Sequence, residues 1–331
     1  MLEKPDLPDE TIEACLRDEY GIEAAEIAFL PLGADAATAV YRVNDDTEAY
    51  FLKLRHGDFD ETAVAVPRFL SDHGVGHIIT PVQTRDGRLW TRVSDFAATL
   101  YPFVEGWNGR EAPPLERHWV ELGVALRAMH TLELPPSLAE RIPRETFSSY
   151  WRDMVRGFQA RVEDTVYAES VAARCAQFVR EKRREINGLV ARAEELAEEL
   201  HAQPPPYVLC HGDIHAWNLL IEADGALYIV DWDTLILAPK ERDLMFVGAG
   251  LGIGDTPEEA ALFYRGYRAT DINLDALAYY RFERIVEDIA AFCQQLLLTD
   301  EGGADREQAL GYLTDSFLPG HVVERAYGTD W

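Results

Sequence analysis

Short apolar runs dominate the first hundred residues of the chain. IAFLPLG, TAVYRV and AYFLKLR are rich in β-branched, aromatic and aliphatic residues, and the turn-like stretches GADAA and NDDTE separate them. Two more such runs, RLWTRVSDF and AATLYPFV, follow a helix-like segment at about residues 60–73. This pattern predicts an antiparallel meander of five strands with one inserted helix. Helical spacing at residues 8–20 predicts a first amphipathic helix before it.

The pattern changes after Val104. The polar stretch EGWNGREAPP carries glycine and proline, and beyond it apolar residues recur at helical spacing, as in ERHWVELGVALRAMHTL. The charged stretch at 145–202 is typical of solvated helix faces. We therefore predict an α+β fold with two lobes, an N-terminal lobe at 1–104 and a mostly helical lobe at 105–331. A chain of 331 residues is long enough for both.

The charge balance bears on possible partners. Asp and Glu number 58 against 31 Lys and Arg, a formal net charge of −27, which repels nucleic acid and favours a cationic small molecule. An acidic proteome or a need for solubility would explain the same excess, so charge alone does not identify a substrate. No apolar run reaches the length of a membrane span, and the first residues lack a secretory pattern, so we expect a cytoplasmic protein without a membrane partner.

The segment CHGDIHAWNLLIEADGALYIVDWD, residues 210–233, holds most of the candidate chemistry. EADG between two apolar runs predicts a loop followed by a hairpin. Asp213 would lie in the loop, Asn218 would begin the first strand and Asp231 would end the second, so the three side chains can reach one small space. Their oxygens suit Mg²⁺, with nucleotide phosphates as further ligands. A carboxylate left off the metal could orient a hydroxyl, and phosphoryl transfer asks little more of a protein.

HGDIHAWN followed by IVDWD resembles the HxDxxxxN motif and the later aspartate of the aminoglycoside phosphotransferase family. The resemblance implies a bilobal protein-kinase-like fold and an O-phosphotransferase that uses ATP or GTP with Mg²⁺. It also implies that Asp213 is catalytic and that Asn218 and Asp231 bind the metal. The stretch DWD with APKERDLMF is similar to spectinomycin-phosphotransferase-like members, which implies an aminoglycoside or aminocyclitol acceptor.

The same resemblance implies a nucleotide site in the N-terminal lobe. Lys53, a lysine inside an apolar strand, would bind the α- and β-phosphates, with Glu61 as its helix partner. Gly33 is the single glycine of the phosphate-covering loop, whose backbone amides would contact the phosphates. The backbone of a hinge would meet the adenine. That hinge comprises Pro102, Phe103 and Val104.

The resemblance implies further roles in the catalytic region. Asp243 would hold the catalytic loop through backbone hydrogen bonds, and His211 would also be structural. Substrate contacts are predicted for Trp232, Asp233 and Glu241.

Three alternatives stay open. His211 and His215 form an H-x-D-x-H pattern like part of a metallohydrolase site, although no DxH upstream or GNH downstream accompanies it. A catalytically silent kinase-like binding module would have lost Lys53, Asp213 or a metal ligand, and all of them are present. The acceptor could also be choline, homoserine, methylthioribose or a sugar. The sequence does not distinguish a monomer from a homodimer.

Overall fold

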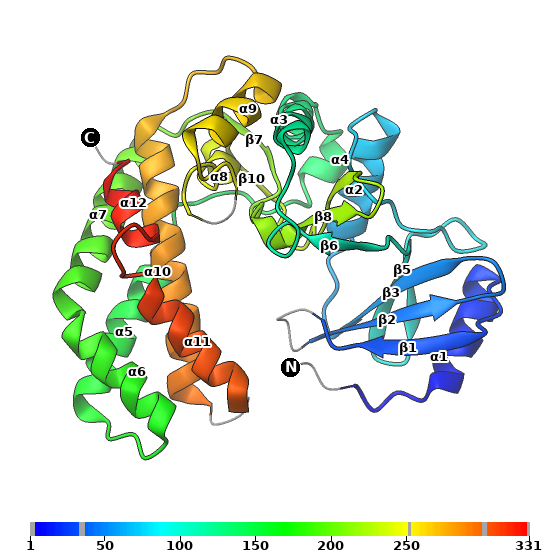
Figure 1. The fold of residues 1–331 in the computed structure, drawn as a ribbon, viewed down its shortest axis with the longest axis horizontal. Coiled ribbons are helices and arrows are strands. Elements are labelled where there is room, and N and C mark those ends of the chain that lie inside the picture. The colour runs from blue at the N-terminus through cyan, green and yellow to red at the C-terminus, as the bar shows by residue number, and fades with distance from the viewer. Residues whose placement is uncertain (1–3, 33–36, 251–252, 300–302, 330–331) are drawn as a thin grey trace. The chain divides into compact units, whose positions relative to one another are not determined.

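The computed structural model describes residues 4–32, 37–250, 253–299 and 303–329 (Figure 1). Contacts divide the chain into two compact units. The sheet unit comprises Met1–Ile142 and Trp217–Leu235, and the helical unit comprises Pro143–Ala216 and Ile236–Trp331. Residues 105–142 and 217–235 thus belong with the N-terminal sheet, whereas the sequence predicted a lobe boundary after Val104.

An antiparallel five-stranded sheet forms the N-terminal part of the sheet unit (Figure 1). The strand order is β1-β2-β3-β5-β4, and α2 is inserted between β3 and β4. The predicted meander with its inserted helix and its preceding helix is confirmed. The elements are α1 (Asp9–Cys15), a π-helical turn (Leu16–Tyr20), β1 (Glu26–Leu30), β2 (Thr38–Asn44), β3 (Ala49–His56), α2 (Thr62–Asp72), β4 (Thr91–Val93) and β5 (Phe96–Pro102).

The alternation of side chains along β3 separates the core of this sheet from its polar face. Leu52 and Leu54 are buried in a cluster that includes Ile12 of α1. Because successive side chains of a strand point to opposite faces, Lys53 and Arg55 lie on the other face of the sheet. The pattern that builds the core therefore also places two cations side by side.

A second, three-stranded sheet carries the predicted hairpin. Its strands are β6 (Gly106–Asn108), β8 (Leu219–Glu222) and β9 (Leu227–Ile229), in the order β6-β8-β9. Gly106 is required by this pairing, because a Cβ there would lie 2.3 Å from the carbonyl oxygen of Ile221. Helix α3 (Glu116–Thr131) holds the hairpin turn, since His118 Nε2 and Arg117 Nη2 both donate to the carbonyl of Gly225, at 2.8 and 2.7 Å. The short helix α4 (Pro136–Ala139) follows.

The helical unit is built around the long helix α10 (Leu274–Leu298), which packs against α7 and α5 (Figure 1). Its buried face includes Phe282, Val286 and Ile289. The prediction of a mostly helical C-terminal part is confirmed. The other elements are α5 (Tyr150–Asp164), α6 (Ser170–Glu181), α7 (Arg183–Ala202), β7 (Tyr207–Cys210), β10 (Ile236–Pro239), α8 (Glu241–Leu244), α9 (Pro257–Tyr267), α11 (Gly303–Asp315) and α12 (Val322–Tyr327).

Within the described ranges, no helix combines the length and the apolar character that a membrane crossing requires.

A buried ion pair joins two helices of this unit. Arg152 of α5 and Glu283 of α10 approach to 2.5 Å between Nη1 and Oε2, and their side chains are 3% and 8% exposed. Arg152 also donates to the carbonyls of Phe147 and Ser148. The guanidinium thus links the loop before α5 to the middle of α10.

Removing one partner of this pair should destabilise the fold. The substitution Glu283→Ala leaves the Arg152 charge buried without its carboxylate, and we expect it to lower the free energy of unfolding by about 3–5 kcal/mol. Denaturant unfolding followed by circular dichroism measures this loss. The matched control is Glu307→Ala, which breaks an exposed ion pair with Arg174, and little change is expected there. Equal losses in the two variants would contradict the prediction.

Candidate functional site

Four charged side chains of the sheet unit form one group, which we call the Lys53 cluster: Lys53, Arg55, Asp231 and Asp233. Lys53 Nζ lies 2.8 Å from Asp233 Oδ2 and 3.3 Å from Asp231 Oδ1. Arg55 Nη1 lies 3.2 Å from the same Asp233 oxygen. Burial alone would lower the pKa of Lys53, but the charge of Asp233 and then that of Asp231 outweigh it and raise this pKa. Lys53 therefore stays a cation.

Glu61, the predicted partner of Lys53, lies elsewhere in the sheet unit. It precedes α2, and its Oε2 accepts from Arg141 Nη2 at 2.7 Å. The structure does not form the predicted Lys53–Glu61 pair, because the Lys53 ammonium faces the two aspartates that follow β9. These aspartates are 178 and 180 residues away along the chain, so only folding brings them to β3.

The two predicted metal ligands lie at the same end of the β8–β9 hairpin. The N–H of Val230 donates to the carbonyl of Asn218 at 3.0 Å, and Asp231 is the next residue. Asp231 has a φ of 64°, a left-handed conformation that aspartate tolerates better than most non-glycine residues. Its carboxylate is 53% exposed. An amide oxygen and an accessible carboxylate are the donor types that Mg²⁺ takes, so these residues fit the metal.

Trp232 does not have the exposure expected of a substrate contact. Its side chain is 7% exposed, and its Nε1 donates to the carbonyl of Ile229 at 3.2 Å. The indole thus fixes the backbone between Asp231 and Asp233, and the predicted substrate role of Trp232 stays a prediction.

The predicted adenine hinge begins at the last residue of β5. Pro102 pairs with Tyr50 at the end of the strand, and the N–H of Phe103 donates to the carbonyl of Ala49 at 2.9 Å. The Arg42 guanidinium lies 4.4 Å from the centre of the Phe103 ring. Adenine binding at Phe103 and Val104 stays a prediction. Gly33 lies outside the described residues.

In the helical unit, Asp243 lies beneath the catalytic loop. Its carboxylate accepts the backbone N–H groups of His211 and Gly212, at 2.9 and 2.8 Å. Gly212 has a φ of 86°, which glycine adopts without strain. His211 Nδ1 accepts the N–H of Asp213 at 3.3 Å. Asp243 and His211 are fully buried, and together they fix the backbone that presents Asp213.

The Asp213 carboxylate has two partners in the helical unit. Arg284 Nη1 lies 2.6 Å from Oδ1, and His215 Nε2 lies 3.3 Å from Oδ2. Burial alone would raise the pKa of Asp213, but the hydrogen bond from His215 and the charge of Arg284 outweigh it and hold this pKa well below its ordinary value. Asp213 is therefore ionised throughout the neutral range. The second histidine of the H-x-D-x-H pattern, His215, therefore contacts the aspartate of the same pattern.

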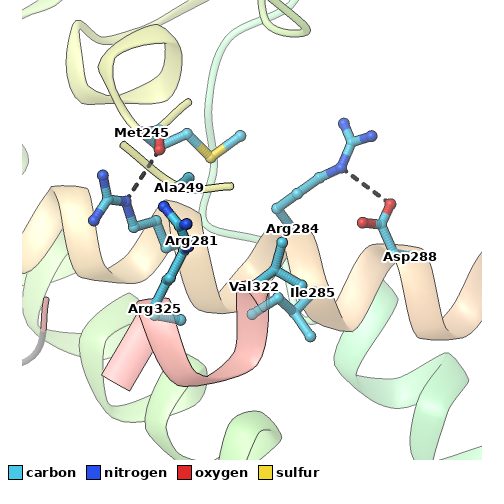
Figure 2. A pocket seen from close by; sticks show the side chains of 9 residues that line it. Met245, Ala249, Arg281, Arg284, Ile285, Asp288, Val322 and Arg325 are labelled. Carbon is cyan, nitrogen blue, oxygen red and sulfur yellow. Dashed lines mark hydrogen bonds and ion pairs between the residues drawn. The ribbon is translucent and has the colours of Figure 1, made fainter. Parts of the chain in front are cut away.

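The sequence analysis missed Arg284. It lies on α10, where its Nε also contacts Asp288 Oδ1 at 3.0 Å, one turn further along the helix (Figure 2). It lines a small pocket with Asp288, Arg281 and Arg325 among other residues. In RFERIVED, residues 281–288, Arg284 stands between Glu283 and Ile285, so the local sequence does not distinguish it from an ordinary helix-surface arginine.

Glu241 belongs to the interior of the helical unit. It is fully buried, and its Oε1 accepts the backbone N–H of Asn273 and contacts Lys240 Nζ, both at 2.9 Å. Asn273 caps α10. Glu241 thus supports the start of α10, and its predicted substrate contact stays a prediction.

Comparison with known proteins gives the family. A family model described as "Phosphotransferase enzyme family" (APH) matches residues 28–282. The chain belongs to this family. The match spans the Lys53 strand, the catalytic loop, the hairpin and the start of α10, and it confirms the resemblance drawn from HGDIHAWN and IVDWD. The chain is therefore a small-molecule kinase.

Three comparisons with individual proteins show how similar the chain is to known relatives. Protein StrN of Streptomyces griseus is 28% identical over 274 residues, which are 77% of this chain and 80% of StrN. The structure of spectinomycin phosphotransferase, APH(9)-Ia, in complex with ADP and spectinomycin is 35% identical, with a TM-score of 0.91 over 97% of this chain and 98% of that one. Its AMP-bound complex has a TM-score of 0.88 at 34% identity, over 99% and 100% of the two chains. The predicted kinase-like fold is confirmed.

Removing the arginine beside Asp213 should change how activity depends on pH. In Arg284→Met the carboxylate loses a nearby positive charge, so its pKa rises and the acid limb of kcat/KM moves to higher pH. Steady-state assays over a pH series measure the position of this limb.

The matched control is Arg281→Met, one turn earlier on the same helix. Arg281 donates to the carbonyls of Met245 and Val247, so its loss should leave the acid limb in place. An acid limb that stays fixed in Arg284→Met, or that moves equally in both variants, would contradict the electrostatic account.

Proposed function

We propose that this kinase transfers the γ-phosphate of ATP to a hydroxyl group of an aminocyclitol or aminoglycoside, with spectinomycin as the leading acceptor. The observation that carries the proposal is the 35% identity, over 97% of the chain, to a spectinomycin phosphotransferase seen with ADP and spectinomycin. The formal charge of −27 supports a cationic acceptor.

The residues of the chain have distinct roles in the proposed reaction. Lys53 holds the phosphates that are not transferred, and Asn218 and Asp231 would hold Mg²⁺. When bound, the metal ion would offset the negative charge of the phosphates. Asp213 accepts a hydrogen bond from the acceptor hydroxyl and orients its oxygen toward the γ-phosphorus. A P–O bond to the acceptor forms, the bond to the β–γ bridging oxygen breaks, and the hydroxyl proton passes to Asp213 and then to solvent.

The low pKa of Asp213 suits an orienting role. A carboxylate held between Arg284 and His215 stays ionised and always accepts a hydrogen bond, but it is a weak base. Phosphoryl transfer through a loose transition state depends mainly on positioning and on charge stabilisation. Asp213 therefore contributes alignment first, and it takes the proton as the new P–O bond completes.

The adenine nucleotides of the two spectinomycin phosphotransferase complexes favour ATP over GTP as the donor. We keep as predictions from the sequence a cytoplasmic location, a monomeric or homodimeric state, and the absence of nucleic-acid and membrane partners.

An ADP-release assay with a panel of acceptors tests the proposal. The panel contains spectinomycin, 4,5- and 4,6-linked aminoglycosides, choline, homoserine, methylthioribose and simple sugars. We expect release with spectinomycin or another aminocyclitol. Release with metabolites alone would contradict the antibiotic acceptor and retain the kinase reaction. ATP binding without turnover of any acceptor would favour the silent binding module.

The variant Asp213→Asn tests the catalytic role. We expect turnover to fall by about a hundredfold to ten-thousandfold, the usual contribution of an acid–base group, while the dissociation constant for ADP stays nearly unchanged. Coupled assays and calorimetric titration measure the two quantities. Asp275→Asn, at an exposed position in the first turn of α10, is the control and should retain full turnover. Full turnover by Asp213→Asn would refute the assignment.

A further inference from the structure

We propose that Asp233, rather than Glu61, is the carboxylate that positions Lys53 for the nucleotide phosphates, and that Arg55 holds Asp233 in place. The inference rests on the proposed kinase reaction and deepens it, because it assigns Asp233 and Arg55 as positioning residues. Asp233 would then act through Lys53 and would not itself touch the acceptor.

Contact geometry is the first support. The contact from Lys53 to Asp233 is 2.8 Å and that to Asp231 is 3.3 Å, so Asp233 is the closer partner. Asp233 is also the less exposed of the two, at 28% against 53%. Charge-assisted hydrogen bonds gain strength where water is partly excluded. Asp233 is thus the better anchor for the lysine.

The second support is that Asp231 and Asp233 would have different roles. A carboxylate that binds Mg²⁺ gives its lone pairs to the metal and is a poorer permanent partner for an ammonium group. Asp231 fits the metal together with Asn218. Asp233 is not one of the proposed metal ligands. If Asp233 holds Lys53, the Asp231 carboxylate is left to bind Mg²⁺.

Arg55 gives the third support. Lys53 and Arg55 are two residues apart on β3, so their side chains lie on one face of the sheet about 7 Å apart at their origins. The carboxylate of Asp233 accepts from both, and both contacts reach the same oxygen. Two cations from one strand hold Asp233 from two directions, which limits the rotamers open to it.

The backbone around Asp233 is also fixed. Trp232 is buried and bonded to the carbonyl of Ile229, and Leu235 is 5% exposed. Asp233 lies between these two anchors, so its carboxylate cannot move far from β3. A fixed carboxylate is what positioning of a flexible lysine requires.

A double-mutant cycle tests the proposal by ADP affinity, measured by calorimetry in metal-free buffer. In the unsubstituted background we expect Asp233→Asn to weaken ADP binding several-fold, because Lys53 is no longer held toward the phosphates. In the Lys53→Met background the same change should cause no further weakening, since the residue through which Asp233 acts is gone. Coupling of this kind is of the order of a few-fold to a hundredfold in such cycles.

Further variants separate positioning from structure. Asp233→Glu keeps the charge and should retain most of the affinity, and Arg55→Gln should weaken ADP binding in the same direction as Asp233→Asn but less. Glu61→Gln tests the rival partner. Asp72→Asn, at an exposed ion pair of α2, is the control for a charge change in this unit. Melting temperatures confirm that each variant is folded.

Three outcomes would overturn the proposal. One is tighter ADP binding in Asp233→Asn when Lys53 is present, which would make Asp233 a competitor of the phosphates. Another is an equal loss of ADP affinity on Asp233→Asn in the unsubstituted and Lys53→Met backgrounds. A third is coupling of Lys53 to Glu61 and not to Asp233. The ADP cycle needs no acceptor, so failure of the acceptor panel leaves it informative, whereas a wild-type chain that does not bind ADP refutes the kinase reaction and the inference together.

Discussion

The two-residue period of β3 is the constraint on which the nucleotide side of the protein depends. Leu52 and Leu54 are buried in the core of the sheet, so Lys53 and Arg55 lie on the opposite face. A one-residue shift of register would bury both cations and expose both leucines. Core packing therefore fixes the position of the two charges more firmly than any contact between charges could.

In each charged group one cation contacts two acids. Lys53 contacts Asp231 and Asp233, and Arg284 contacts Asp213 and Asp288. The chain has 58 acidic and 31 basic residues, so cations are scarce. Lys53 and Arg284 thus each offset part of the negative charge of two carboxylates.

The catalytic loop is held by hydrogen bonds from its backbone to a buried carboxylate. Asp243 is fully buried, and the backbone N–H groups of His211 and Gly212 donate to its two carboxylate oxygens. A buried carboxylate without such donors would be costly. The need to satisfy it holds His211 and Gly212 in one conformation, and Asp213 is the next residue. The loop is thus rigid because of an electrostatic requirement in the interior.

Sequence patterns were enough to predict the five-stranded meander, its inserted helix, the helical C-terminal part, the family and the strand position of Lys53. These follow from local periodicity and from a motif within 24 residues, 210–233, where spacing along the chain sets spacing in space. The partners of the charged side chains are set by the folding of the chain. Asp233 instead of Glu61 at Lys53, Arg284 at Asp213, and the burial of Trp232 and Glu241 depend on residues brought together across long stretches of chain. Local patterns do not encode such contacts, because a carboxylate or an arginine looks the same in sequence whether it faces solvent, a ligand or another charge.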